Sequence, residues 1–168
     1  RAYMAGNFGS FRSENAVTLQ VDTTLENQTI ESFGASDAWN MDFVGKYWSE
    51  SEKELMAKRL FGRSMDTSGN PEGIGLSGWR FNIGAGSSEQ AEASGIVTET
   101  RRTECFLLPD NSYDWTKQAG QRWFLEKAKS YGVESFTAFA NSAPVYFTKN
   151  GLARGSDGET NLKDEHYD

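Results

Sequence analysis

The chain has 168 residues, with 17 Lys and Arg against 24 Asp and Glu and a formal net charge of −7. An acidic chain repels a polyanion, so nucleic acid is not expected as a partner. One cysteine, Cys105, and one histidine, His166, exclude an intrachain disulfide framework and a Cys/His metal cluster. We therefore expect no metal and no cofactor.

The chain has no run of the roughly 18 apolar residues that a membrane span needs, and its polar first 15 residues lack the apolar core of a signal peptide. It fits either a mature exported protein or a cytosolic one. Its 5 Trp, 6 Tyr, 11 Phe and 17 Gly suit a carbohydrate-binding surface, and an ordinary aromatic core would give the same count.

Alternating apolar and polar residues predict a half-buried strand at Val17–Val21 and a second one at Thr29–Phe33, which Gly34 ends. A capping box beginning at Ser49 predicts a helix that runs to about Phe61. Its expected buried residues are Leu55, Met56 and Leu60, with Gly62 as the stop.

A strand is predicted over Leu76–Ile83, with Trp79, Phe81 and Ile83 on one face, and about thirty residues of loop follow it. Asp114 is expected to cap a helix from Trp115 to Tyr131 that buries Trp115 and Trp123 and stops at Gly132. A third strand is predicted over Val133–Ala140, and a further helix begins near Leu162–Asp168.

Alternating strands and helices are typical of parallel βα units, so the predicted class is α/β. Parallel strands are normally covered on both faces, and three strands with two helices leave one face and both edges open. We therefore expect this segment to be part of a larger sheet.

The sequence Gly73–Gly78 matches the dinucleotide fingerprint G-x-G-x-x-G. That fingerprint needs a strand before it and a helix after it, whereas here a loop precedes and a strand follows. Nucleotide binding is therefore not expected.

Arg80 lies between Trp79 and Phe81 in a strand, where an unpaired guanidinium would be costly to bury. We expect an acidic partner for it. The pair could be an ion pair within the sheet, or Arg80 could hold a catalytic carboxylate in its charged form.

Three segments are informative together, namely Ser32–Trp39, Gly75–Ser87 and Phe139–Gly151. They resemble successive blocks of the family 30 glycoside hydrolases, closest to the β-1,6-galactanase-like branch. The resemblance implies the first βα units of a (β/α)8 TIM barrel over residues 29–168. It also implies that residues 1–28 contribute a strand to an appended β-sandwich. The remainder of the barrel would then be the partner of this segment.

The resemblance further implies a retaining hydrolase of β-linked glycans, with two carboxyl groups roughly 5 Å apart. In the family the acid/base Glu lies in an Asn-Glu-Pro motif after the fourth strand, and the nucleophile follows the seventh. Neither motif occurs in this chain, so no catalytic residue is expected within it. Secreted, periplasmic or cell-surface localisation is implied in the same way.

In such a barrel the carboxyl ends of the strands face the substrate. The substrate-binding residues expected from this placement are Asp37, Trp39, Arg80, Ser87, Asn141 and Tyr146. Ser87 and Asn141 stand where the glucosylceramidase branch has an acidic residue and a Trp, which favours galactan or a related plant or microbial glycan over a glucosylceramide. Asn141 could instead only cap the turn that follows it.

The sequence thus predicts an exported β-glycanase, endo-β-1,6-galactanase-like, acting on an oligo- or polysaccharide. The alternative is a non-catalytic carbohydrate-binding protein that keeps a hydrolase-type barrel.

Overall fold

The computed structural model describes residues 20–155, 158 and 160–167. The chain divides into two compact units, residues 1–30 and 31–168. Within the described part of the first unit, Asp22 organises a turn by accepting hydrogen bonds from the N–H (2.9 Å) and the hydroxyl (2.7 Å) of Thr24. The predicted strand at Val17–Val21 lies mostly outside the described residues, and its last two residues, Gln20 and Val21, are not in a strand.

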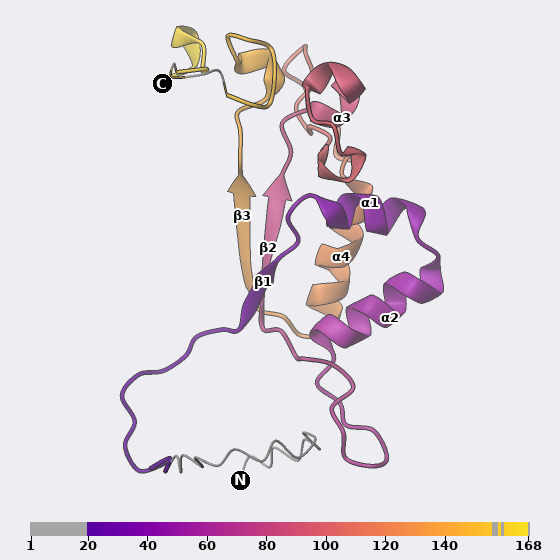
Figure 1. The fold of residues 1–168 in the computed structure, drawn as a ribbon, viewed down its shortest axis with the longest axis vertical. Coiled ribbons are helices and arrows are strands. Elements are labelled where there is room, and N and C mark those ends of the chain that lie inside the picture. Colours follow the sequence, from indigo (N-terminus) through magenta and orange to yellow (C-terminus); the bar gives the residue numbers. More distant parts are fainter. Residues whose placement is uncertain (1–19, 156–157, 159, 168) are drawn as a thin grey trace, which may run out of the picture. The chain divides into compact units, whose positions relative to one another are not determined.

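The second unit is built on a parallel sheet in the order β1-β2-β3, with helices along one side of it (Figure 1). The strands are β1 (Gly34–Ser36), β2 (Gly78–Ile83) and β3 (Ser135–Ala140). The helices are α1 (Asn40–Tyr47), α2 (Glu50–Phe61), α3 (Ser87–Gln90) and α4 (Ala119–Ser130), and short 3-10 turns lie at Ala91–Ser94, Glu99–Arg101, Val145–Phe147 and Asp164–His166. The predicted α/β class with parallel strands is confirmed.

The first strand lies later in the chain than predicted. The residues Gly34–Ser36, which we expected to end a strand, themselves form β1, whereas Thr29–Phe33 are not in a strand. A Cβ on Gly34 would come within 3.1 Å of the carbonyl oxygen of Gly78, its partner on β2. Pairing with β2 at this close distance therefore outweighs the weak strand propensity of these small residues.

The helix predicted after Ser49 is confirmed as α2. Ser49 and Glu52 form the capping box, and Gly62 follows the last helical residue. The predicted buried stripe was wrong for Leu55, which is 55% exposed, whereas Met56 and Leu60 are partly buried and pack against the core. The fully buried positions of the helix are Lys53, Ala57 and Phe61. Lys53 can be buried because its ammonium group donates to the carbonyl of Gly45 and lies over the ring of Trp123.

Helix α1 was not predicted, and it crosses α4 at two glycines. A Cβ on Gly45 would lie 2.4 Å from the Cα of Gly120, and a Cβ on Gly120 would lie 2.0 Å from the carbonyl oxygen of Asp42. Only residues without side chains allow backbones to approach this closely. Asp42 also accepts hydrogen bonds from the N–H groups of Gly120 (3.1 Å) and Gln121 (3.4 Å) at the start of α4.

Helix α4 begins four residues later than predicted. Asp114 caps a local turn by accepting from Thr116 instead of capping the helix, and Gln118 precedes the helix with a left-handed φ of 50°. Trp115 therefore lies outside the helix and is 64% exposed, so its predicted place in the core was wrong. Trp123 packs against the core, and Gly132 ends this region with a φ of +83°.

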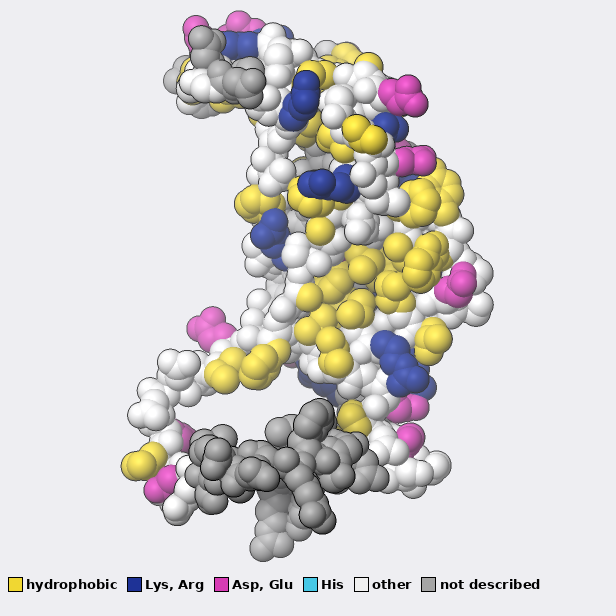
Figure 2. All heavy atoms as spheres, viewed as in Figure 1, with side chains coloured by type: hydrophobic (Ala, Val, Ile, Leu, Met, Phe, Trp, Pro, Cys, Tyr) yellow, Lys and Arg dark blue, Asp and Glu magenta, His cyan; other side chains and the backbone are white. Residues whose placement is uncertain are grey.

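The core lies between the sheet and the helices. Phe61 meets Trp79 edge-on with ring centroids 5.0 Å apart, and the other buried members are Val44, Ala57, Leu76, Phe124, Ala128 and Val133. Of the three residues predicted to share one face of this strand, Trp79 and Phe81 are buried, whereas Ile83 is 36% exposed. Hydrophobic side chains also gather at the surface where α1, α2 and α4 lie (Figure 2).

Every residue of β1 and of β3 is exposed within the described chain. An apolar cavity of about 590 Å³ lies against β3 and is lined mainly by Phe81, Phe106, Trp115, Leu125, Ala138 and Phe147. Strands β1 and β3 are thus the open edges of the sheet in the described residues, as the sequence predicted. The helix expected near Leu162–Asp168 is a single 3-10 turn in the residues described there.

Candidate functional site

A cavity of about 600 Å³ opens at the carboxyl ends of the three strands. Because the strands are parallel, the residues that follow each of them meet at the same edge of the sheet. Trp39 follows β1, Ala85 and Ser87 follow β2, and Asn141 and Ser142 follow β3. The long loop after β2 and the segment at Ala153–Gly155 complete the lining.

Three of the six predicted substrate-binding residues line this cavity: Trp39, Ser87 and Asn141. The guanidinium of Arg101 lies 5.1 Å from the ring centroid of Trp39, so that this aromatic face is partly covered by a cation. The hydroxyl of Ser87 accepts from the N–H of Thr103 at 2.9 Å and is buried. Ser87 therefore anchors the long loop to the start of α3.

The Asn141 side chain is exposed at the cavity and makes no hydrogen bond with the described residues. An amide that is free in this way can donate to and accept from a ligand. The alternative role, a cap for the turn that follows, would need a bond between this side chain and the backbone, and the described residues include none.

The other three predicted residues, Asp37, Arg80 and Tyr146, do not line the cavity in the described structure. Asp37 is 2% exposed, and its N–H donates to the carbonyl of Arg80 at 3.0 Å. Tyr146 is half-buried in the 3-10 turn after β3, and its carbonyl accepts from Lys163 at 2.7 Å. Burial raises the pKa of the Tyr146 phenol.

Arg80 has no acidic partner within ion-pair distance among the described residues. Its guanidinium instead lies over the ring of Phe139 on β3, 3.9 Å from the centroid. The expectation of an ion pair within this part of the sheet was therefore wrong: the strand is open on this face, so the cation keeps contact with water and needs no buried carboxylate.

Burial of the Asp37 carboxyl raises its pKa to about 7. The side chain of Gln121, the N–H of Asn82 and the charge of Arg80 oppose this rise, and the charge of Asp42 adds to it. Asp37 is thus a buried acid that changes its charge near neutral pH.

Among the lining residues that the sequence did not single out are Asn82 and Arg101. Asn82 could have been found, because it lies two residues after Arg80 and strand alternation puts both on one face of β2. Arg101 comes from the long loop, whose path no periodic pattern predicts.

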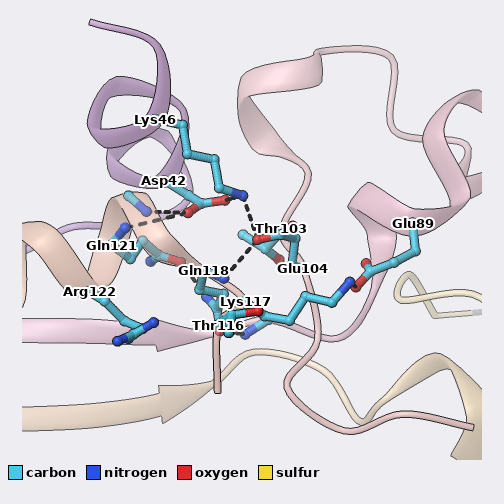
Figure 3. Close-up of polar contacts among 12 residues, drawn as sticks. Asp42, Lys46, Glu89, Thr103, Glu104, Thr116, Lys117, Gln118, Gln121 and Arg122 are labelled. Carbon is cyan, nitrogen blue, oxygen red and sulfur yellow. Dashed lines mark hydrogen bonds and ion pairs between the residues drawn. The ribbon is translucent and has the colours of Figure 1, made fainter. Parts of the chain in front are cut away.

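A polar cluster joins α1, the long loop and α4 beside this cavity (Figure 3). Lys46 donates to Asp42 at 2.9 Å and to Glu104, and Glu104 in turn accepts from the N–H of Gln118 at 2.7 Å. Burial alone would lower the pKa of Lys46, but the hydrogen bonds to Glu104 and Asp42 outweigh it and raise that pKa. The cluster fixes the loop against the start of α4.

The cavity lining contains the cations Arg101 and Arg154 and, within the described chain, no Asp or Glu. The described residues also include no group of three or more His, Cys, Asp or Glu placed to hold a metal ion. None of the helices described is long and apolar enough to cross a membrane. The arrangement is therefore suited to binding a polar, uncharged or anionic ligand by hydrogen bonds and one aromatic face.

The chain is similar in sequence to two curated proteins whose names both refer to β-1,6-linked galactosides. The chain is 28% identical over 174 residues to an endo-beta-1,6-galactanase of Hypocrea rufa, covering 94% of this chain and 35% of that protein. It is 41% identical over 58 residues to an exo-beta-1,6-galactobiohydrolase of Bifidobacterium longum, covering 32% of this chain and 4% of that protein. The chain therefore spans about a third or less of these relatives.

Among solved structures, a conserved exported protein from Bacteroides fragilis is 46% identical with a TM-score of 0.79, over 86% of this chain and 30% of that one. The sequence profile of O-glycosyl hydrolase family 30 matches residues 16–168, which is nearly the whole chain. The resemblance first seen in the three blocks is thus confirmed, and the chain belongs to family 30 of the O-glycosyl hydrolases.

Proposed function

We propose that this chain is the N-terminal part of a retaining glycoside hydrolase that cleaves β-1,6-linked galactan from within. The observation that carries the proposal is the cavity at the carboxyl ends of three parallel strands, in a chain that belongs to family 30. The relatives from Hypocrea rufa and Bifidobacterium longum, both named for β-1,6-galactoside hydrolysis, support this substrate class.

In this proposal, residues 29–168 form the first βα units of a (β/α)8 barrel, and residues 1–28 contribute a strand to a β-sandwich. The open edges of β1 and β3 and the apolar cavity against β3 support it, because further βα units would cover them. The two catalytic carboxylates would come from those later units and face the same cavity. Export of the Bacteroides fragilis relative supports a secreted, periplasmic or cell-surface location.

The contacts to substrate that we propose from this chain are Trp39, Asn141 and, at the cavity wall, Ser87. Trp39 would stack on a sugar ring, and Asn141 would hydrogen-bond neighbouring hydroxyls at the cleavage subsite. Arg80 would hold the nucleophile carboxylate in its charged form from the sheet beneath. Tyr146 would contact substrate from the 3-10 turn after β3, outside this cavity.

A second candidate function is sugar binding without hydrolysis, since the described lining offers an aromatic ring and hydrogen-bonding side chains that would bind a sugar in either case. Purified full-length protein incubated with linear β-1,6-galactan separates the two. We expect a ladder of oligosaccharides, with the β-anomer formed first by proton NMR, as retention requires. Binding of the polymer without new reducing ends would instead establish the binder, and cleavage restricted to β-1,3- or β-1,4-galactan or xylan would overturn the proposed substrate.

A further inference from the structure

Asn82 lies on β2 where this strand passes the end of β1. Strand β1 ends at Ser36, which pairs with Arg80, so no β1 residue is left to pair with Asn82. Side chains replace the missing strand. The N–H of Asn82 donates to the Asp37 carboxyl at 3.1 Å, and its carbonyl accepts from the Gln118 amide at 2.8 Å.

Gln118 satisfies one backbone group in β2 and one directly after it with a single side chain. Its amide nitrogen donates to the carbonyl of Asn82, and its amide oxygen accepts from the N–H of Gly84 at 3.1 Å. A neighbouring strand would make the same two bonds to alternate residues. The side chain is fully buried, so losing either bond would leave an unsatisfied polar group.

The backbone of Gln118 has an uncommon conformation at the point where its side-chain amide reaches Asn82 and Gly84. Its φ of 50° lies in the left-handed region that residues with a side chain seldom adopt. Glu104 accepts the N–H of Gln118, and Lys46 binds Glu104, so the cluster in Figure 3 secures this turn. Such conformations persist only where surrounding contacts determine them.

Gln121 extends the same arrangement to the loop after β1. Its amide oxygen accepts from Gln118, and its amide nitrogen donates to the carbonyl of Ala38 at 2.9 Å. Ala38 directly precedes Trp39, which lines the cavity. One turn at the start of α4 thus ties together the ends of β1 and β2.

We propose that Asn82 is an additional substrate contact at the floor of the cavity, and that Asp37, Gln118 and Gln121 are positioning residues that hold it and Trp39 in place. The inference rests on the proposed function, since the ligand is taken to be a β-galactoside. Asn82 lines the cavity although it is only 2% exposed, and its side-chain amide makes no hydrogen bond with the described residues. This amide can therefore donate to one ring hydroxyl and accept from the next. Asp37, which the sequence suggested as a substrate contact, acts in this scheme through Asn82.

The test uses the full-length enzyme and an aryl β-1,6-galactobioside together with its monodeoxy analogues. We expect Asn82→Ala to lower kcat/KM about tenfold or more on the parent substrate, the size of one lost hydrogen bond. On one deoxy analogue the penalty should vanish, because the partner hydroxyl is already absent. Asn70→Ala, which removes an exposed amide bound to Asp66, is the matched control. It should leave kcat/KM unchanged on the parent substrate and on the deoxy analogue.

Gln118→Glu tests the positioning role. It keeps an acceptor for Gly84 but replaces the donor to Asn82 with an oxygen, so kcat/KM should fall with the same dependence on the deoxy analogue. A variant that only lowers Tm, with equal losses on the parent and on every analogue, would show a structural role and overturn the inference.

Failure of the proposed function can be told apart from failure of the Asn82 inference. If the wild type cleaves no β-1,6-galactoside, the proposed function fails. Wild type, Asn82→Ala and Asn70→Ala are then compared by their calorimetric affinity for β-1,6-galactobiose. An affinity reduced by Asn82→Ala but not by Asn70→Ala would support the Asn82 contact in a sugar-binding protein. Equal affinities, or no binding by the wild type, would overturn it.

Discussion

The guanidinium of Arg80 lies 3.9 Å from the centre of the Phe139 ring, across the pair of strands β2 and β3. This contact aligns the cation along the sheet while leaving its donors available to a carboxylate from another part of the protein. Arg80 is exposed in the described chain, so its guanidinium is accessible to such a carboxylate.

Arg80→Ala in the full-length enzyme should lower kcat by roughly 100-fold while KM changes only a few-fold, because a charge that supports the nucleophile acts mainly in the chemical step. Steady-state kinetics on β-1,6-galactan oligosaccharides give both values. Arg63→Ala is the control, since Arg63 contacts the carbonyl of Gly132 at the opposite end of β3. Unchanged kcat in the Arg80 variant would refute the role.

Asn141→Ala should lower the rate of the chemical step by roughly 10- to 100-fold, the effect of one or two hydrogen bonds that tighten in the transition state. The melting temperature should stay close to that of the wild type, because the Asn141 side chain bonds to none of the described residues. Turnover and thermal unfolding of the full-length variant check this. A lower melting temperature with normal turnover would make Asn141 a turn residue.

The buried carboxyl of Asp37 predicts a pH-dependent stability. Its pKa is about 7 in the folded protein and 3.8 for an ordinary carboxyl, so the folded state binds more protons between these values. The free energy of unfolding should therefore fall as the pH rises from about 4 to about 7, by on the order of a few kcal/mol, and then level off.

Asp37→Asn keeps an acceptor for the N–H of Asn82 but carries no charge, so this decline should largely disappear in the variant. Denaturant unfolding of the full-length protein at several pH values measures it. The nearby charges are Arg80 and Asp42, and Arg80 opposes the rise in pKa. Parallel pH profiles for wild type and variant would contradict the prediction.

The crossing of α1 and α4 predicts intolerance at Gly120. A Cβ there would lie 2.0 Å from the carbonyl oxygen of Asp42, and backbone cannot move aside as a side chain can. Gly120→Ala should cost about 2 kcal/mol or more, since overpacking costs roughly 1–3 kcal/mol and the gain in helix propensity is only about 1 kcal/mol. Thermal unfolding checks it, with Gly155→Ala as the control, since a Cβ at Gly155 would meet none of the described residues within 4 Å.

The 168-residue chain alone should not unfold cooperatively, because both outer strands are exposed and an apolar cavity lies against β3. We expect strong binding of a hydrophobic dye and a broad thermal transition in the isolated chain. A sharp melting transition with a dispersed amide spectrum would show that the segment is an independent domain.

The sequence predicted the elements whose signals are local. The capping box at Ser49 and the glycine stop at Gly132 mark the ends of helical regions by backbone chemistry that neighbouring residues complete. The family was also evident, because three separated blocks occur in the right order. These signals do not depend on contacts between distant residues.

Tertiary contacts determined the rest. Strand β1 depends on the close approach of Gly34 to Gly78. The late start of α4 goes with the hydrogen bond that the Gln118 amide, just before the helix, donates to the carbonyl of Asn82 on β2. Helix α1 depends on Gly45 meeting Gly120, which no periodic pattern reveals. At the site, strand ends predicted Trp39, Ser87 and Asn141, whereas the path of the loop that brings Arg101 to Trp39 follows from packing.

The order of the strands in the sheet has a consequence for synthesis of the protein. Because β1, β2 and β3 are neighbours in the same order as in the chain, each strand leaving the ribosome can add to an edge that already exists. Each pairing nevertheless joins distant residues, Gly34 with Gly78 and Gly78 with Ser135, so it is slow compared with helix formation. The newest strand is thus an open edge during translation, available to a chaperone until the next element of the chain covers it.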